Sequence, residues 1–144
     1  MNENKNHSLG SQNFYVAVVD DEFDLVSLFR DALNRIEGCT VFGFTDPELA
    51  LEHFIINQEY YQLILSDYRM PGLTGIELLK KVNEIKPSIK ALLMSAFEIR
   101  DDEMFQECVT KNIITGFLQK PARMSNLIDE VTKQISPQQQ IREN

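Results

Sequence analysis

Cysteine and histidine are scarce in this sequence, and a glycine-rich phosphate loop is absent. The two cysteines, Cys39 and Cys108, lie far apart and form no Cys-x-x-Cys motif. We therefore expect reduced thiols and neither a disulfide nor a zinc site. His7 stands in a polar N-terminal stretch and His53 in a helical pattern, so neither completes a set of metal ligands. Without a phosphate loop, nucleotide binding of the P-loop type is also disfavoured.

Long apolar runs and clusters of basic residues are missing as well. No apolar run approaches the length of a membrane-spanning helix, and the N-terminus has no apolar signal core. The formal net charge is -8, with lysine and arginine scattered along the chain. This charge opposes direct binding to the phosphates of nucleic acids. We therefore expect a cytoplasmic protein that contacts neither membranes nor nucleic acids directly.

The sequence does contain a regular alternation of two patterns over its 144 residues. Five short β-prone runs are FYVAVV (14–19), TVFGF (40–44), QLILS (62–66), ALLMS (91–95) and TGFLQ (115–119). Segments with helical period follow them, at about 25–36, 45–55, 76–86, 98–112 and 127–135. Because parallel strands need crossover connections, this alternation predicts an α/β fold, a doubly wound parallel sheet with helices on both faces.

The helical segments differ in how clearly they define a buried face. In the first and second segments, apolar residues recur at three- and four-residue spacing, which predicts contact with the core. These residues are Leu25, Leu28, Phe29, Ala32, Leu33 and Ile36 in the first segment and Leu51, Phe54 and Ile55 in the second. The letters TDPE at 45–48 predict a capping box at the start of the second helix. The fourth segment has few apolar residues, so we expect it to be less firmly docked than the others.

One globular domain is predicted to span residues 13–135. Residues 1–12 are polar and are expected to form a disordered tail. Residues 136–144 (SPQQQIREN) are rich in glutamine and are expected to be a polar tail or the start of a linker. The chain is therefore either a single-domain protein or a domain excised from a longer one.

Polar residues collect where the predicted strands end. Asp20 and Asp21 follow the first strand and Asp67 the third, while Ser95 ends the fourth and Lys120 follows the fifth. Each alone has an ordinary explanation as a cap, turn or surface residue. The carboxyl ends of parallel strands share one edge of the sheet, however, and ligands bind there. If the first and third strands are neighbours, three carboxylates converge, and a divalent cation such as Mg²⁺ would relieve their repulsion.

The same residues indicate phosphoryl chemistry. A carboxylate held by Mg²⁺ and flanked by a lysine can act as a nucleophile on phosphorus. Lys120 would then offer an ammonium group, and Ser95 a hydroxyl group, to the oxygens of a phosphoryl group. The product would be an aspartyl phosphate on Asp67.

Four motifs in order, VVDDE, LILSDYRMPGLTG, LLMSA and GFLQKP, resemble the receiver domains of two-component response regulators, the CheY-like family. The resemblance covers about residues 13 to 135. It implies a flavodoxin-like (βα)5 fold with strand order 2-1-3-4-5. It also implies a phosphorylation-dependent signalling switch, a protein that accepts a phosphoryl group but is not an enzyme in the ordinary sense.

The resemblance assigns roles to the acidic residues. Asp67 would accept the phosphoryl group from the phosphohistidine of a sensor histidine kinase or a phosphotransfer protein. Asp21 and Asp67 would ligate Mg²⁺ directly, together with the backbone carbonyl of Arg69. Asp20 would act mainly through a bound water. The resemblance thus names one cofactor, Mg²⁺.

Further roles follow from the same resemblance. Ser95 and Lys120 would each contact a phosphoryl oxygen, and the Lys120-Pro121 peptide bond is expected to be cis. Phe117 occupies the position of the aromatic switch residue that couples to Ser95, where the family often has tyrosine. The phosphorylation signal would be read out at the surface formed by the fourth helix, fifth strand and fifth helix, by an effector protein or a missing output domain. A homodimer formed on phosphorylation is compatible with that surface.

Two positions are expected to tune the lifetime of the phosphoryl group. They are Arg69, two residues after the acceptor, and Phe97, two residues after Ser95. A bulky Phe97 would hinder an attacking water, and Arg69 would pair with the phosphoryl group or with the ring of Phe97. These residues predict slow self-dephosphorylation.

Two other function classes remain open at this point. The first is a receiver-like scaffold that binds partners without phosphorylation. The second is an aspartate-nucleophile phosphohydrolase of the haloacid dehalogenase type. That enzyme family expects a second acid two residues after the nucleophile, where this sequence has Arg69. Flavodoxin-like cofactor binding is weaker still, because acids stand after the first strand in place of a hydroxyl-rich phosphate loop.

Overall fold

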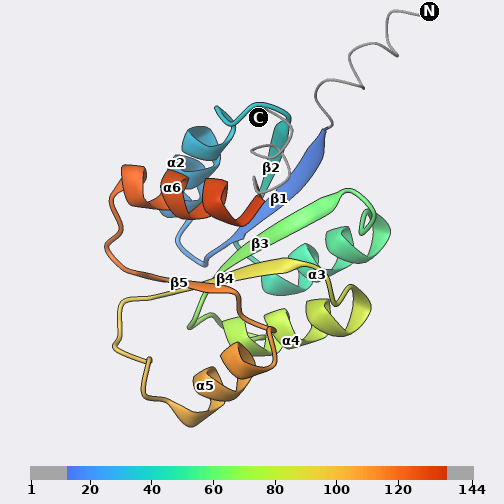
Figure 1. The fold of residues 1–144 in the computed structure, drawn as a ribbon. Helices are drawn as coiled ribbons and strands as arrows, with labels where there is room; N and C mark the ends of the chain where they lie inside the picture. Colours follow the sequence, from blue (N-terminus) through green and yellow to red (C-terminus); the bar gives the residue numbers. More distant parts are fainter. Residues whose placement is uncertain (1–12, 136–144) are drawn as a thin grey trace, which may run out of the picture.

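Five parallel strands form one sheet in the order β2-β1-β3-β4-β5, as Figure 1 shows for the computed structural model of the chain. The strands are β1 (Phe14–Val19), β2 (Cys39–Phe44), β3 (Tyr61–Asp67), β4 (Lys90–Ser95) and β5 (Gly116–Gln119). The structure describes residues 13–135, so the tails predicted at 1–12 and 136–144 lie outside the described residues. The predicted strand order is confirmed.

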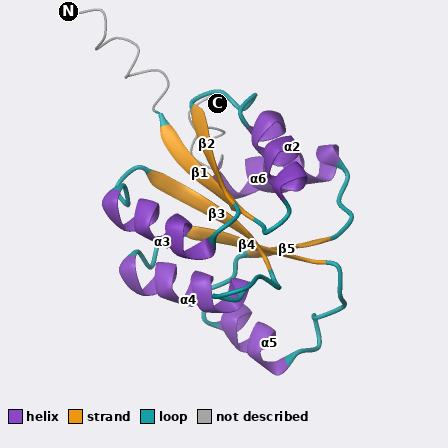
Figure 2. Cartoon of the chain, turned by 180° about the vertical axis from the view of Figure 1, so that it is seen from behind, coloured by secondary structure: helices purple, strands orange, loops and turns teal. Residues whose placement is uncertain are grey.

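Five helices connect the strands and cover both faces of the sheet (Figure 2). They are α2 (Phe23–Leu33), α3 (Pro47–Ile56), α4 (Gly75–Ile85), α5 (Glu103–Thr110) and α6 (Met124–Ile135). Helices α3, α4 and α5 lie on one face, and α2 and α6 lie on the other. Within the described residues, none of these helices is long and apolar enough to cross a membrane.

The sheet separates two hydrophobic cores. Neighbouring residues of β1 alternate between them: Ala17 and Val19 belong to the core under α3, α4 and α5, whereas Val16 and Val18 belong to the core under α2 and α6. All four side chains are almost completely buried. This explains why the strand is apolar without a break, since both of its faces are covered.

Two helical residues do not face the core as predicted. Leu28 of α2 and Ile55 of α3 are exposed. In α2 the buried positions are Phe29, Ala32 and Leu33, as predicted, together with Val26. The rotation of 100° per residue places Leu28 past the edge of the face that these residues form.

The helix starts also differ in part from the predictions. The N-cap of α3 is Asp46, whose side chain accepts a hydrogen bond from the N–H of Glu48, so the capping box predicted from Thr45 is wrong. A true capping box opens α4, where Thr74 and Glu77 exchange hydrogen bonds between side chain and backbone. It had no counterpart in the predictions, although it satisfies two N–H groups of the helix start.

Helix α5 is shorter than the predicted segment 98–112. It begins only at Glu103, after Asp102 caps the N–H of Phe105, so residues 98–102 form the loop after β4. Of its residues, only Phe105 and Cys108 are buried. The buried face is smaller than those of α2, α3 and α4, as expected, whereas α6 likewise has two buried residues, Leu127 and Val131.

Candidate functional site

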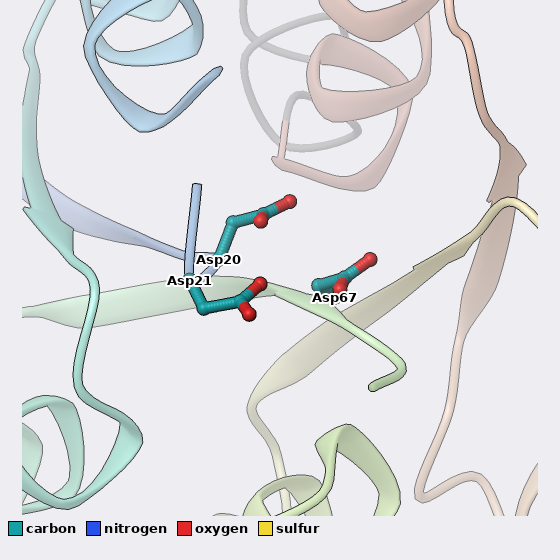
Figure 3. Close-up of side chains that lie close together, drawn as sticks. All are labelled: Asp20, Asp21 and Asp67. Atoms are coloured by element: carbon teal, nitrogen blue, oxygen red, sulfur yellow. The ribbon is translucent and has the colours of Figure 1, made fainter. Parts of the chain in front are cut away.

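Three carboxylates meet at the carboxyl edge of the sheet, where strand order reverses between β1 and β3. Asp20 and Asp21 follow β1 and Asp67 ends β3, and the two strands pair in register through Val19 and Ser66. One carboxylate oxygen from each acid lies within 4.8 Å of the others. Figure 3 shows the three side chains beside one another. The predicted convergence of the acids is therefore present.

Asp20 is held in place by both its backbone and its side chain. It is fully buried. Its N–H donates to the carbonyl oxygen of Phe44 at the end of β2, at 3.1 Å. Its Oδ1 accepts the N–H of Glu22 at 3.0 Å, which fixes the turn into α2. The side chain of Asp20 thus stabilises the turn into α2 and also belongs to the acidic cluster.

A close backbone approach fixes the end of β3. The N–H of Gly75, the first residue of α4, donates to the carbonyl oxygen of Tyr68 at 2.9 Å. A Cβ atom at Gly75 would lie 2.2 Å from the carbonyl oxygen of Asp67. Only glycine allows α4 to start so close to the strand that carries Asp67. No sequence prediction assigned this role to Gly75, although a glycine next to a helix cap is a recognisable signal.

Lys120 supplies the cation of the site. Its Nζ donates hydrogen bonds to Oδ2 of Asp20 and to Oδ1 of Asp67, each at 3.0 Å. The backbone N–H of Lys120 donates to the carbonyl oxygen of Ser95 at 2.8 Å, and the following bond to Pro121 is cis, as predicted. One ammonium group therefore joins the ends of β1 and β3 to the residue after β5.

Charge and burial act together on these groups. Burial raises the pKa of Asp67, the nearby carboxylates of Asp20 and Asp21 raise it further, and the hydrogen bond from Lys120 opposes the shift. Burial alone would lower the pKa of Lys120, but hydrogen bonds to Asp20 and Asp67 outweigh it and the pKa lies above its ordinary value. Three acids face one ammonium group, and this excess of hard oxygen donors fits a cation such as Mg²⁺.

Ser95 lies at the same edge, at the end of β4. It is almost completely buried, and its Oγ accepts the N–H of Phe97 at 2.9 Å. In the paired strands, Asp67 is opposite Met94, the residue before Ser95. The structure thus brings Ser95 to the edge that holds the acids and the lysine.

The two residues expected to tune the phosphoryl lifetime touch each other. The guanidinium carbon of Arg69 lies 4.4 Å from the centre of the Phe97 ring, one of the two contacts predicted for Arg69. Both belong to loops at the site, after β3 and after β4. A cavity of about 710 Å³ opens beside Arg69, and Asp21, Met70 and Met104 are also among the residues that line it.

Phe117 of β5 is half-buried, between the core and the surface. Its ring meets that of Phe105 of α5 edge to face, with 5.6 Å between the ring centres. The guanidinium carbon of Arg100 lies 5.7 Å from the Phe117 ring, and Arg100 is paired with Glu98 at 3.1 Å. The sequence singled out Phe117 but did not indicate its contacts with Phe105 and Arg100, because both contacts depend on the fold.

The fold and the site together define a doubly wound α/β protein with a cluster of acids at its switch point. The family model described as the response regulator receiver domain matches residues 16–132. The chain belongs to this family. The predictions of the family and of its flavodoxin-like fold are therefore confirmed.

Several known proteins are similar to the chain. Sporulation initiation phosphotransferase F of Bacillus subtilis is 31% identical over 121 residues, which cover 84% of this chain and 93% of that protein. The hydrogenase transcriptional regulatory protein HoxA of Cupriavidus necator is 32% identical over 85% of this chain, which spans 24% of that longer protein. A receiver domain structure from Clostridium thermocellum has a TM-score of 0.76 at 20% identity, over 89% of this chain and 98% of that chain.

Proposed function

We propose that the protein is a phosphorylation-dependent signalling switch whose phosphoacceptor is Asp67. The observation that carries the proposal is the bridge from Lys120 to Asp20 and Asp67, with Asp21 in the same cluster. Family membership and a 31% identical relative named a phosphotransferase support it. The partners would be a sensor histidine kinase or a phosphotransfer protein, and an effector protein or output domain.

In the proposed reaction, a carboxylate oxygen of Asp67 attacks the phosphorus of a phosphohistidine. The new P–O bond forms as the P–N bond breaks, and the imidazole leaves with the electron pair. The ammonium group of Lys120 and the hydroxyl group of Ser95 hydrogen-bond the phosphoryl oxygens. Asp20, Asp21, Asp67 and the carbonyl of Arg69 would hold Mg²⁺.

When bound, Mg²⁺ would neutralise charge that develops on the phosphoryl oxygens. The donor set supports this assignment, because carboxylate oxygens are ligands that Mg²⁺ prefers. A similar structure, the response regulator TrrA from Thermotoga maritima, was solved in complex with Mg²⁺ and BeF. It shares 24% identity and a TM-score of 0.72 with this chain and covers 85% of it.

Phosphorylation would change binding at the surface formed by α5, β5 and α6. Two contacts support this output. Phe117 links β5 to Phe105 of α5, and α5 buries only two residues, so a small free energy is enough to move it. Arg100 reaches the same ring from the loop that begins after Ser95. A movement of this loop toward a phosphoryl group would therefore change the contact between Arg100 and the Phe117 ring.

Asp67→Asn is expected to abolish phosphorylation, because the amide is a poor nucleophile. The wild-type chain, incubated with Mg²⁺ and a small phosphodonor, should gain the mass of one phosphoryl group. Beryllofluoride should shift the backbone amide signals around Phe117 and α5. Asp24→Asn is the matched control, since Asp24 is an exposed acid of α2 outside the cluster.

Each alternative predicts a different result of this experiment. A variant that is still labelled at the wild-type rate would refute Asp67 as the acceptor. Turnover of the phosphodonor without a lasting adduct would indicate the phosphohydrolase. Partner binding that is unaffected by Asp67→Asn and by beryllofluoride would indicate the phosphorylation-independent scaffold.

Phe97→Ala is expected to shorten the lifetime of the phosphorylated protein. The exposed ring stacks on Arg69 next to the site, where it obstructs water and holds the guanidinium. Loss of one such contact corresponds to a decay about two- to fivefold faster. Decay of the labelled protein after removal of the donor measures this rate. Tyr60→Ala, an exposed aromatic residue at the opposite end of β3, should leave the rate unchanged; equal lifetimes for Phe97→Ala and wild type would contradict the assignment.

A further inference from the structure

Helix α3 lies at one end of the layer that also contains α4 and α5 (Figure 2). It packs against β1, β2 and α4. On the side away from these elements, Leu49 is 54% and Ile56 is 75% exposed. Apolar residues thus occur on both the inner and the outer sides of this helix, whereas a helix of that kind is normally covered all round. The outer side of α3 is therefore a surface that a further element would cover.

Two aromatic residues of β2 extend this apolar side. His53 lies between Leu49 and Ile56 on the helix, and its ring centre is 4.4 Å from that of Phe42 and 5.5 Å from that of Phe44. Both phenylalanines are half-buried. The contacts make the side chains of strand and helix one continuous surface. We call the surface formed by Phe42, Phe44, Leu49, His53 and Ile56 the β2–α3 surface.

The β2–α3 surface is bordered by acids and lacks basic residues. Residues 38–60 contain four acids, Asp46, Glu48, Glu52 and Glu59, and no lysine or arginine. All four are exposed. Glu52 lies three residues after Leu49 and four before Ile56, so it belongs to the same strip of the helix. Burial lowers the pKa of His53, which disfavours the charged form of this ring.

Burial lowers the pKa of Lys86, and the charge of Glu59, one of the four acids, partly opposes this shift. The ammonium group of Lys86, which follows α4, donates to the carbonyl oxygens of Gln58 at 2.8 Å and Tyr61 at 2.6 Å. These bonds hold the ammonium group at the backbone between α3 and β3, where Glu59 is the acid that interacts with it. Asp46, Glu48 and Glu52 keep the border acidic, which favours an occupant with lysine or arginine.

Hydrogen bonds along β2 disfavour a strand as the occupant. The N–H of Phe14 donates to the carbonyl oxygen of Gly38, so the even-numbered residues of β2 form the hydrogen bonds to β1. The N–H groups of the odd-numbered residues therefore point outward, away from β1. The outward N–H of Cys39 donates to the carbonyl of Ile36, and that of Val41 donates to Oδ1 of Asn34, each at 3.1 Å. The first half of this edge strand is thus already paired, so it cannot be extended by another strand there.

Charge disfavours a second copy of the chain. A two-fold dimer through this surface would bring Glu52 and its acidic neighbours close to their own copies, between molecules of net charge -8. We infer that the β2–α3 surface binds an amphipathic helix of a partner protein, with apolar residues at three- and four-residue spacing bordered by lysine or arginine. β2 and β5 are opposite edges of the sheet, so this partner and one on the α5–β5–α6 side can bind together.

The test uses the full chain labelled with ¹⁵N and a designed peptide of leucine and lysine with amphipathic helical spacing. We expect amide shifts concentrated in residues 40–60. Leu49→Ser combined with Ile56→Ser should weaken binding about tenfold or more. The matched control is Phe23→Ser with Leu28→Ser, because these apolar residues of α2 are 67% and 51% exposed. It should bind the peptide as wild type does.

A second variant examines the acidic border without changing the apolar side chains. Glu48→Gln with Glu52→Gln should weaken binding about three- to tenfold and reduce its dependence on salt. A leucine and glutamate peptide of the same spacing should not bind. The inference would be overturned by shifts centred on Asp20, Asp21 and Asp67, by equal weakening in the α2 control, or by no binding. A concentration-dependent dimer in sedimentation that Leu49→Ser disrupts would assign the surface to a second copy instead.

Discussion

Gly75→Ala is expected to lower the free energy of unfolding by about 1–3 kcal/mol and to slow phosphorylation of Asp67 about 10- to 100-fold. The new methyl group would lie 2.2 Å from the carbonyl oxygen of Asp67 and 2.9 Å from Cδ1 of Leu93. The first of these atoms is backbone, so α4 or the end of β3 has to move. Either movement displaces the carboxylate that is proposed to react.

Urea unfolding and the initial rate of labelling by a small phosphodonor measure the two effects of Gly75→Ala. Gly72→Ala is the matched control in the same loop. Its φ is +88°, but nothing lies within 4 Å of the added Cβ atom. It should cost about 1–2 kcal/mol through the backbone alone and leave the labelling rate nearly unchanged. If both glycine variants slow labelling equally, steric contact with Asp67 is not the cause.

Lys120→Met should have the largest effect on stability in the absence of Mg²⁺. It removes the cation from two carboxylates, of which Asp20 is fully buried and Asp67 nearly so. A buried ion pair that loses one partner costs several kcal/mol, and the slight exposure of Lys120 reduces this to about 2–4 kcal/mol. Labelling should also fall sharply, because the ammonium group would no longer contact the phosphoryl oxygens.

Two comparisons separate charge from packing in the Lys120 variant. Added Mg²⁺ should restore part of the lost stability, because a divalent cation compensates the same carboxylates. Asp67→Asn in the Lys120→Met background should also restore part of it. Lys133→Met is the matched control, because its pair with Glu130 is on the surface and the lysine side chain is 72% exposed; it should cost less than about 1 kcal/mol. A loss in Lys120→Met that neither Mg²⁺ nor Asp67→Asn relieves would point to packing.

The strands and the site edge were predictable from the sequence for a physical reason. A strand buried on both faces, such as β1 or β4, is apolar without a break, so its end is marked by the first polar residues. In a parallel sheet those ends share one edge. Asp20, Asp67 and Lys120 therefore met in the structure although they are far apart in sequence, and they were predicted without any knowledge of side-chain positions.

Features that depend on tertiary contacts were not predictable in the same way. Leu28 and Ile55 fit an apolar period but are exposed, because the period does not define how wide the buried face of a helix is. Residues 98–102 were predicted to be helical but form a loop. The difference depends on one hydrogen bond, in which the side chain of Asp102 accepts the N–H of Phe105 and caps the helix there. Arg100, in the loop before α5, contacts Phe117, in the strand after α5. The spacing of residues in the sequence does not predict this contact.

The hydrogen bonds of Asp20 connect it to both edges of the sheet. Its N–H is tied to Phe44 at the end of one edge strand, and its Oδ2 is tied to Lys120, just beyond the end of the other. β5 is the shortest strand, and fraying of its end would release the ammonium group from Asp20. Loss of order at the end of either edge strand would therefore remove one of the hydrogen bonds that position Asp20 beside Asp21 and Asp67.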